Sequence, residues 1–212
     1  MEGALHHGAD PGLRLIETLG WDGARFVRRD LHLARLAASA ARLGWACAPA
    51  VLPAAAAALQ ATADAVAAPA RVRLTVAADG GVDVTTAPMP APEPVWRLAL
   101  ATERLASCDP WLSVKSTRRP AYDAARAALP AGIDEVILLN ERGEVCDGSI
   151  TTLFFDRGHG LRTPPLSSGV LPGVLRTELA PAQEVLMADD LPRVRLWVGN
   201  SLRGLIAGVW TG

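Results

Sequence analysis

The chain has 212 residues, of which half are hydrophobic and a fifth are charged, and its formal net charge is −1. This size and composition indicate a globular protein of one or two domains. The near-neutral charge provides no basic surface for nucleic acid, so a small-molecule substrate or a protein partner is expected.

No targeting, membrane or metal-binding segment is predicted. The first eleven residues are polar and contain no apolar core of the signal-peptide kind. The Ala-rich run 52–70 comes nearest to the ~20 apolar residues of a membrane helix, but Gln60, Thr62 and Asp64 interrupt it. The three cysteines are odd in number and too widely spaced for a metal pair, which suits a reducing cytoplasm.

Hydrophobic periodicity predicts a hairpin and two helices before residue 70. Residues 13–19 and 25–28 are predicted strands around the turn 20–23. Asp30 is expected to cap a helix that Gly44 ends. Apolar residues fall at helical spacing in this helix: Leu33, Leu36, Ala37, Ala40 and Leu43. A second helix is predicted over 53–68, with Pro53 in its first turn.

A second hairpin and a proline-rich connector follow. Residues 71–77 and 82–86 flank the turn Asp79-Gly80-Gly81, which is a strong hairpin signal. Prolines at every second position from 88 to 94 favour an extended connector. A strand is predicted next, over 95–101. We therefore expect a small α/β domain over residues 1–101 and a larger one over residues 102–212.

The larger domain is predicted to alternate strands and helices. The predicted strands are 112–115, 134–140, 150–155 and 193–198. The predicted helices are 121–129 and 174–179, and Glu141-Arg142-Gly143 is a predicted turn. The expected fold class is therefore mixed α and β in two domains.

Lys115 is the only lysine among 21 basic residues. It follows the apolar segment 111–114, where a lysine can lose its proton by desolvation and form a Schiff base. A coding preference for arginine would leave the same pattern. The residue by itself therefore leaves a functional and an accidental interpretation open.

Two segments are candidates for binding a phosphate. Residues 171–175 place Pro172 and Gly173 before a helix, where free amides and the helix dipole favour an anion. Gly199-Asn200-Ser201 offers amides and a hydroxyl after a strand. Many such turns bind nothing, so both segments are equally compatible with ordinary connections.

Two charged residues also have two interpretations each. Asp147 precedes a buried strand, where it could pair with a protonated pyridine nitrogen or bond its own backbone as a turn residue. Arg35 lies one helical turn after His32 among apolar residues. Its guanidinium could extend to water or bind a phosphate.

Six motifs recur in one order along the chain: IET (16–18), HLARL (32–36), VKSTRR (114–119), GIDEVILLNERGEVCDGSITTLFF (132–155), TPPLSSGVLPGVLR (163–176) and VGNSLRG (198–204). Their order and spacing resemble the class IV aminotransferases, which are pyridoxal 5'-phosphate (PLP) enzymes. The family includes branched-chain and D-amino acid aminotransferases and 4-amino-4-deoxychorismate lyase. The resemblance covers nearly all of the chain from Leu13 onward.

The resemblance implies a two-domain, D-amino acid aminotransferase-like fold (fold type IV) with a trimmed N-terminal domain. It implies that Lys115 is catalytic and holds PLP as a Schiff base, and that Asp147 faces the pyridine nitrogen. The implied phosphate contacts are Arg35, Val174, Leu175 and Ser201. Arg73 is expected to bind a substrate carboxylate, and the expected assembly is a homodimer acting on a small amino substrate.

Some positions depart from the family pattern. Gly20 stands where arginine is common, Asp147 replaces glutamate, Leu175 replaces threonine and Thr152 replaces asparagine. VGNSLRG looks most like the lyase branch. The expected function is therefore a lyase of folate biosynthesis that converts 4-amino-4-deoxychorismate to 4-aminobenzoate and pyruvate. An amino-acid aminotransferase and a degenerate, non-catalytic member are the alternatives.

Overall fold

The computed structural model describes residue 10 and residues 12–212. They form two compact units, the first comprising residues up to Ala91 together with Val114–Arg118, and the second comprising Pro92–Ser113 together with Arg119–Gly212. The expected boundary after Ala101 put the strand that follows the connector in the first domain. In the structure this whole strand lies in the second unit. The segment that contains Lys115 lies in the first.

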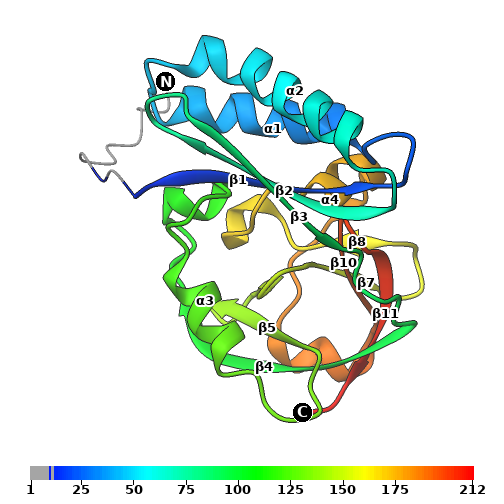
Figure 1. Cartoon of the computed structure of the whole chain (residues 1–212). Coiled ribbons are helices and arrows are strands. Elements are labelled where there is room, and N and C mark those ends of the chain that lie inside the picture. The colour runs from blue at the N-terminus through cyan, green and yellow to red at the C-terminus, as the bar shows by residue number, and fades with distance from the viewer. Residues whose placement is uncertain (1–9, 11) are drawn as a thin grey trace. The chain divides into compact units, whose positions relative to one another are not determined.

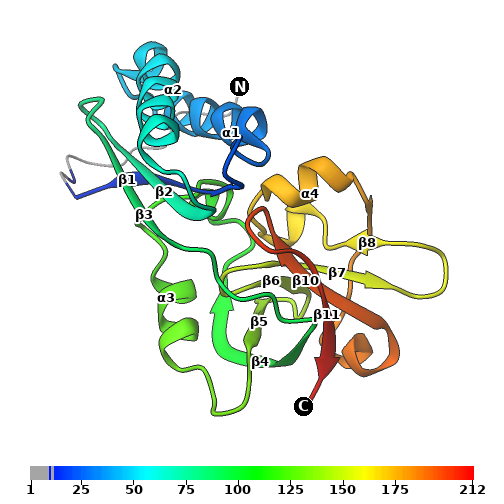
Figure 2. The ribbon, with the colours of Figure 1, turned by 45° about the vertical axis from the view of Figure 1, so that its right-hand side comes forward.

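The first unit is a three-stranded antiparallel sheet with two helices on one face (Figures 1 and 2). The strands are β1 (Arg14–Trp21), β2 (Ala70–Ala77) and β3 (Val82–Pro88), and the helices are α1 (Arg29–Arg42) and α2 (Ala48–Ala65). Leu15, Leu19 and Leu74 are buried, because alternate side chains of each strand point to the same face. The predicted second hairpin is confirmed.

Three expectations for this unit are wrong. Residues 25–28 form no strand, and only the single bridge between Trp21 and Phe26 remains of the first hairpin. Asp30 does not cap α1, which begins at Arg29 after a left-handed Arg28 (φ 56°), so Asp30 lies in the first turn. Helix α2 begins at Ala48, five residues before the predicted start, because Pro49 fills the first-turn position that Pro53 was expected to take.

The second unit is built on one sheet of eight strands in the order β10-β11-β4-β5-β6-β7-β8-β9, and β10 also pairs with β7. The sheet thus closes on itself from β10 through β11, β4, β5 and β6 to β7. The strands are β4 (Val95–Leu105), β5 (Glu135–Asn140), β6 (Val145–Gly148), β7 (Thr152–Asp156), β8 (Arg162–Thr163), β9 (Ala182–Gln183), β10 (Arg195–Asn200) and β11 (Gly204–Trp210).

Short helices complete the second unit. These are α3 (Pro120–Ala127), α4 (Val174–Leu179), and the 3-10 helices η1 (Pro110–Ser113), η2 (Leu166–Ser168) and η3 (Ala188–Arg193). Helix η1 ends at Ser113 and so occupies the first half of the predicted strand 112–115, which is wrong for those residues. Helices α3 and α4 are confirmed, and α4 has the predicted bounds. Strands β6, β8, β9 and β11 were not predicted.

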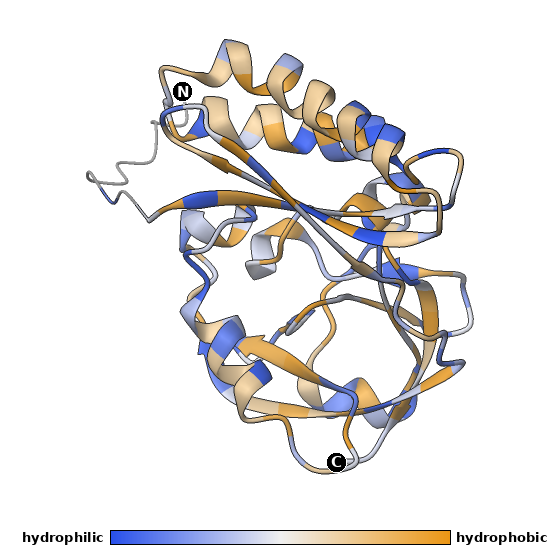
Figure 3. Ribbon diagram, viewed as in Figure 1, coloured by the Kyte–Doolittle hydropathy of each residue, from blue (hydrophilic) through white to orange (hydrophobic). Residues whose placement is uncertain are grey.

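The core of the second unit consists of two apolar clusters, one on each side of the curved sheet. Strand β5 is buried along its whole length, which its continuous apolar run predicts, and it is largely orange in Figure 3. On β6, Val145 belongs to one apolar cluster and Cys146 to the other. Within the described residues, no helix is long and apolar enough to cross a membrane.

Candidate active site

Lys115 is held beside β1 in the first unit. Its carbonyl accepts a hydrogen bond from the Ile16 amide at 2.9 Å, and the Thr117 amide donates to the Arg14 carbonyl at 2.9 Å. The bridge between Leu15 and Ser116 lies between these two bonds. The segment therefore follows β1 as a short added strand, which fixes the lysine backbone although its side chain is only half-buried.

A buried carboxylate joins β1 to α1. Glu17 accepts from Nε of Arg35 at 2.9 Å and from Nη2 of Arg35 at 2.6 Å, and its Oε2 lies 2.5 Å from Nδ1 of His32. Glu17 and His32 are each 2 % exposed. The predicted phosphate arginine thus has two of its five donors on a carboxylate, and this pairing sets the direction of its guanidinium plane.

The charge state of Glu17 follows from its partners. Burial by itself raises the pKa of the Glu17 carboxyl. The Arg35 charge and the hydrogen bonds of His32 and Arg35 outweigh that effect, so the pKa lies below its ordinary value. Glu17 is therefore an anion at neutral pH, and His32 must carry a proton on Nδ1 in order to donate to it.

Arg73 lies on the sheet face away from the helices. It pairs with Thr18 across β1 and β2, whereas Leu74 pairs with Glu17 on the face that α1 covers. Its side chain is exposed. Arg73 and Arg35 therefore belong to opposite faces of the sheet in the first unit.

In the second unit, Asp147 is fixed near the end of β6. It is 3 % exposed, and its Oδ2 accepts a hydrogen bond from the Leu171 amide at 2.8 Å. The Asp147 backbone pairs with Thr152 of β7. The carboxylate therefore holds a loop far away in sequence, and this contact differs from the local turn bond that was one interpretation of the residue.

A second buried carboxylate, Glu135, shapes the turn after Asp147. It accepts from the amides of Ser149 (3.0 Å) and Ile150 (3.1 Å) and from the hydroxyls of Ser149 (2.5 Å) and Thr151 (2.8 Å). A Cβ at Gly148 would lie 2.7 Å from Oε2 of Glu135, so only glycine fits there. Four donors of one turn are thereby paired with a single buried carboxylate.

The three predicted cofactor segments of the second unit converge on Thr152. Thr152 pairs with Asp147 on one side and with Gly199 on the other. A Cβ at Gly173 would lie 2.7 Å from the Thr152 Oγ1. Asp147, the start of α4 and the strand that leads to Ser201 are therefore neighbours in space.

Leu175 also contacts this strand. A Cβ at Gly199 would lie 2.8 Å from the Cδ2 of Leu175 and 2.5 Å from the Gly204 carbonyl. Asn200 then closes the tight β10–β11 turn, because its Oδ1 accepts from the Leu202 amide at 3.1 Å and the Arg203 amide at 3.0 Å. Ser201 is buried at the tip of that turn. Close backbone approach explains the glycines that the sequence places beside both predicted phosphate segments.

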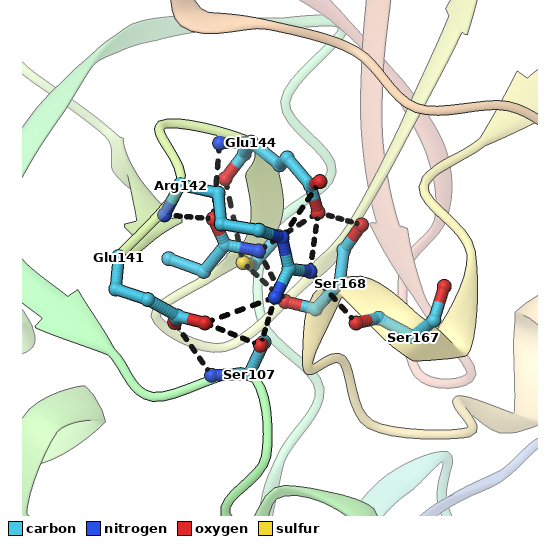
Figure 4. A network of polar contacts seen from close by, with 8 residues as sticks. Ser107, Glu141, Arg142, Glu144, Ser167 and Ser168 are labelled. Carbon is cyan, nitrogen blue, oxygen red and sulfur yellow. Dashed lines mark hydrogen bonds and ion pairs between the residues drawn. The ribbon is translucent and has the colours of Figure 1, made fainter.

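A polar network on the β5–β6 turn holds the loop that leads to Leu171 (Figure 4). Arg142 pairs with both oxygens of Glu144, at 2.9 and 2.7 Å, and Oε2 of Glu144 accepts from the Ser168 hydroxyl at 2.8 Å. Arg142 also reaches Glu141 and the Ser107 hydroxyl. The network therefore holds the β5–β6 turn against Ser168, which shortly precedes Leu171, the residue whose amide donates to Asp147.

The network lowers the pKa values of two of its carboxyls, Glu141 and Glu144. Hydrogen bonds from Arg142, Asn140 and Ser168 outweigh partial burial and lower the pKa of Glu144 to about 2. The hydroxyl and amide of Ser107 lower the pKa of Glu141 to about 2. Both groups are anions throughout the physiological pH range.

Three buried residues received no role from the sequence: Glu17, Glu135 and Arg176. Their partners lie far away along the chain, as with Glu17 and Arg35 at a separation of 18 residues. Arg176 is buried on α4, and its Nη1 donates to the Pro164 carbonyl at 2.5 Å. Burial lowers the pKa of the Arg176 guanidinium, while the charge of Asp147 raises it. The sequence did contain one signal for a role of Glu17, because it is a charged residue at an inward-facing position of the predicted strand 13–19.

The comparisons with known proteins agree with this fold. The chain matches the sequence model of the family described as amino-transferase class IV over residues 14–208. A crystal structure from Mesorhizobium loti, described provisionally as an amino-acid aminotransferase, is 43 % identical, with a TM-score of 0.87 over 94 % of this chain and 100 % of that one. No curated protein sequence gives a significant match.

Two more distant structures share the fold. The 4-amino-4-deoxychorismate lyase of Pseudomonas aeruginosa is 24 % identical, with a TM-score of 0.83 over 96 % of this chain and 85 % of that one. A hypothetical aminotransferase of Mycobacterium tuberculosis, with α-ketoglutarate and pyridoxamine phosphate bound, is 24 % identical, with a TM-score of 0.78 over 98 % and 86 % of the two chains.

The architecture is that of the fold-type IV, PLP-dependent enzymes. The chain belongs to the class IV aminotransferase family, and its cofactor is PLP.

Proposed function

We propose that this enzyme is a lyase that converts 4-amino-4-deoxychorismate to 4-aminobenzoate and pyruvate. The observation that carries the proposal is the convergence of Asp147, Gly173 and Gly199 on Thr152, which brings a carboxylate together with the two backbone segments that we propose to bind the phosphate. The sharp β10–β11 turn at Asn200 supports the lyase branch, because VGNSLRG is the motif that resembles that branch.

The residues fit a PLP cofactor by their chemistry. Lys115 supplies the amine, Asp147 a carboxylate for the pyridine nitrogen, and Arg35 a cation for the phosphate. The amides of Val174 and Leu175 and the hydroxyl of Ser201 supply neutral phosphate donors. Leu175 has no hydroxyl, so Arg35 and Ser201 would supply a larger share of the phosphate binding.

When bound, PLP supplies an electron-withdrawing ring that stabilises negative charge on the substrate α-carbon. In the proposal, Asp147 holds a proton on the ring nitrogen. Lys115 would hold PLP through its Nζ, and the same amine would carry the α-proton of the substrate to the carbon that receives it in the product. Arg73 orients a substrate carboxylate.

The decisive experiment concerns Lys115. The purified enzyme, saturated with PLP, is reduced with borohydride and its peptides are mapped. Because the chain contains one lysine, label is expected on Lys115, and the Lys115→Arg variant is expected to remain unlabelled there. A saturated wild type with no label, or with label on the α-amine alone, would contradict the proposal.

An amino-acid aminotransferase is the second candidate, and the 43 % identity to the Mesorhizobium loti protein favours it. Release of pyruvate and 4-aminobenzoate from aminodeoxychorismate supports the lyase. Amino transfer from glutamate or a branched-chain or D-amino acid to a keto acid supports the aminotransferase. A protein that stays colourless after PLP is added would favour a degenerate member. A cytoplasmic homodimer is part of the proposal, and sedimentation tests the assembly.

A further inference from the structure

The chain contains one tyrosine, and its hydroxyl is buried with no hydrogen-bond partner in the part of the chain that the structure describes. Tyr122 lies on α3 of the second unit (Figure 1). Its ring keeps some exposure, but its Oη is inaccessible to solvent and has no hydrogen-bond partner among the residues that the structure describes. A buried hydroxyl in this state is destabilising, because it has lost its hydrogen bonds to water. Such a group is unusual in a native fold, and its hydroxyl is available to a bound acceptor.

The Tyr122 ring is held firmly in place. The Arg119 guanidinium lies 5.0 Å from the ring centroid. Arg119 is itself fixed by Asp123, at 2.9 Å, and by the Ser149 carbonyl, at 2.6 Å. Since Ser149 belongs to the turn that Glu135 shapes, the ring is tied to the turn that follows Asp147.

The surroundings place the ring close to the Asp147–Leu171 contact. Tyr122 packs against the apolar cluster that includes Cys146 and Val170, which are the residues immediately before Asp147 and Leu171. Burial raises the pKa of Tyr122 well above its ordinary value, and the charge of Asp147 raises it further. The hydroxyl therefore keeps its proton and acts as a donor.

We infer that the Tyr122 hydroxyl is a further ligand-binding group of this enzyme, and that it donates a hydrogen bond to an anionic or carbonyl oxygen of the molecule bound beside Asp147. This inference rests on the proposed PLP site. The acceptor oxygen belongs either to the cofactor or to the amino substrate, since both carry oxygens of this chemistry. Tyr122 thus completes its hydrogen bonding only when the enzyme is loaded.

The Tyr122→Phe variant tests the inference, because it removes the hydroxyl and keeps the ring. Three quantities are compared with wild type: the melting temperature without PLP, the dissociation constant and visible spectrum with PLP, and KM for the amino substrate that the wild type turns over, beginning with aminodeoxychorismate. Without PLP, the variant is expected to melt at the same temperature as wild type or higher. PLP binding or KM is expected to weaken by about tenfold or more, as for a lost hydrogen bond to a charged acceptor.

Thr211→Val is the matched control. The Thr211 hydroxyl donates to the Leu98 carbonyl at 2.9 Å, so its partner is protein. This variant is expected to melt at a lower temperature than wild type and to bind PLP and substrate normally. Comparison of the two variants distinguishes a hydroxyl that binds the ligand from one that stabilises the fold.

The outcomes are distinct. Weaker PLP binding with a shifted visible band assigns the acceptor to the cofactor, and a raised KM with unchanged PLP binding assigns it to the substrate. Unchanged binding, spectrum and KM overturn the inference and leave the PLP proposal standing. A clear fall in the melting temperature without PLP also overturns it, because the hydroxyl then has a protein partner. A wild type that takes no PLP on Lys115 overturns both.

Discussion

At the scale of single residues, Asp147 is positioned by its environment. One of its oxygens accepts from the Leu171 amide, and the residue is almost completely buried. An ionised carboxylate in this place can hold a proton on the cofactor ring, which an amide of nearly the same shape cannot do. The Asp147→Asn variant is therefore expected to fold and to take PLP on Lys115, but to lose turnover by about 10²–10⁴-fold.

The measurement is kcat and melting temperature side by side. If Asp147 only anchors the loop, the amide oxygen of asparagine keeps the Leu171 bond, and stability changes by about a kcal/mol with kcat nearly intact. Unchanged kcat in an active wild type would reject the ring-nitrogen role.

Single residues also show what a sequence can and cannot reveal. Lys115 stands out because it is the only lysine, and its chemistry follows from its residue type. The pairing of Glu17 with Arg35 and His32 could not be predicted, since it depends on which face of β1 meets α1. The lone hydroxyl of Tyr122 is defined by the absence of a protein partner among the described residues, and only a three-dimensional structure reveals it.

At the scale of elements, the β5–β6 hairpin acts as an anchor. Glu144 holds the Ser168 hydroxyl, and the Cys146 thiol contacts the Ser168 carbonyl at 3.0 Å. Gly169 follows with φ 87°, and a Cβ there would lie 2.8 Å from the Cα of Ser107. The chain then enters the core at Val170 and reaches Asp147 at Leu171. The loop that leads to α4 is thus fixed at Ser168 and at Leu171.

Weakening this anchor should loosen the loop without unfolding the sheet. In Glu144→Gln the neutral side chain keeps its size but loses the charged pair with Arg142. The expected result is faster amide exchange at Val170 and Leu171 and weaker PLP binding, by about two- to tenfold, because the loop must be ordered again when the cofactor binds. Hydrogen exchange and PLP titration measure the two effects.

Arg157→Met provides the control for this prediction. Arg157 makes a similar partly exposed ion-pair network, with Glu184 at 3.0 Å and Asp190 at 2.6 Å. Its loss should leave both PLP binding and exchange at Leu171 unchanged. Equal effects in the two variants would show that any lost ion pair loosens the loop.

The elements that sequence predicted best are those whose pattern is local. Helix α4 begins after Pro172-Gly173, and the β2–β3 hairpin turns at Gly80, whose φ of 91° requires glycine. Residues 112–115 failed because their apolar run does not distinguish a strand from the 3-10 turn that buries Trp111. Strands β8 and β9 have two residues each, too few for any period to appear.

At the scale of the whole molecule, carboxylates with lowered pKa values occur in both units. Glu17 joins β1 to α1 in the first unit. Glu141, Glu144, Asp156 and Asp190 lie in the second, where backbone amides or arginines stabilise their charged forms. Each of these groups binds a proton less readily in the folded chain than in the unfolded one. Stability is therefore linked to pH in both units.

The direction of this dependence follows from the lowered values. The stabilisation from such a carboxylate is fully present above its unfolded pKa, near 4.5 for glutamate, and is lost as the pH falls through the folded pKa, which is about 2 for Glu144. The melting temperature is therefore expected to be nearly constant from neutral pH to about pH 5 and to fall steadily at lower pH. Thermal unfolding over a series of buffers at constant ionic strength measures it.

The Glu17→Gln variant separates the contribution of the buried Glu17–Arg35 ion pair to stability from that of the more exposed ion pairs. At neutral pH this variant should lose about 3–5 kcal/mol in the free energy of unfolding, because the largely buried Arg35 guanidinium loses the carboxylate that balances its charge. Below pH 4.5 its melting temperature should fall less steeply than that of wild type, since a glutamine has no proton to gain there. Glu93→Gln, on the exposed connector, is the control and should match wild type in both respects. An acid slope in Glu17→Gln equal to that of wild type would mean that the Glu17 pKa is not lowered by folding, and that Arg35 is held by something other than the charge on Glu17.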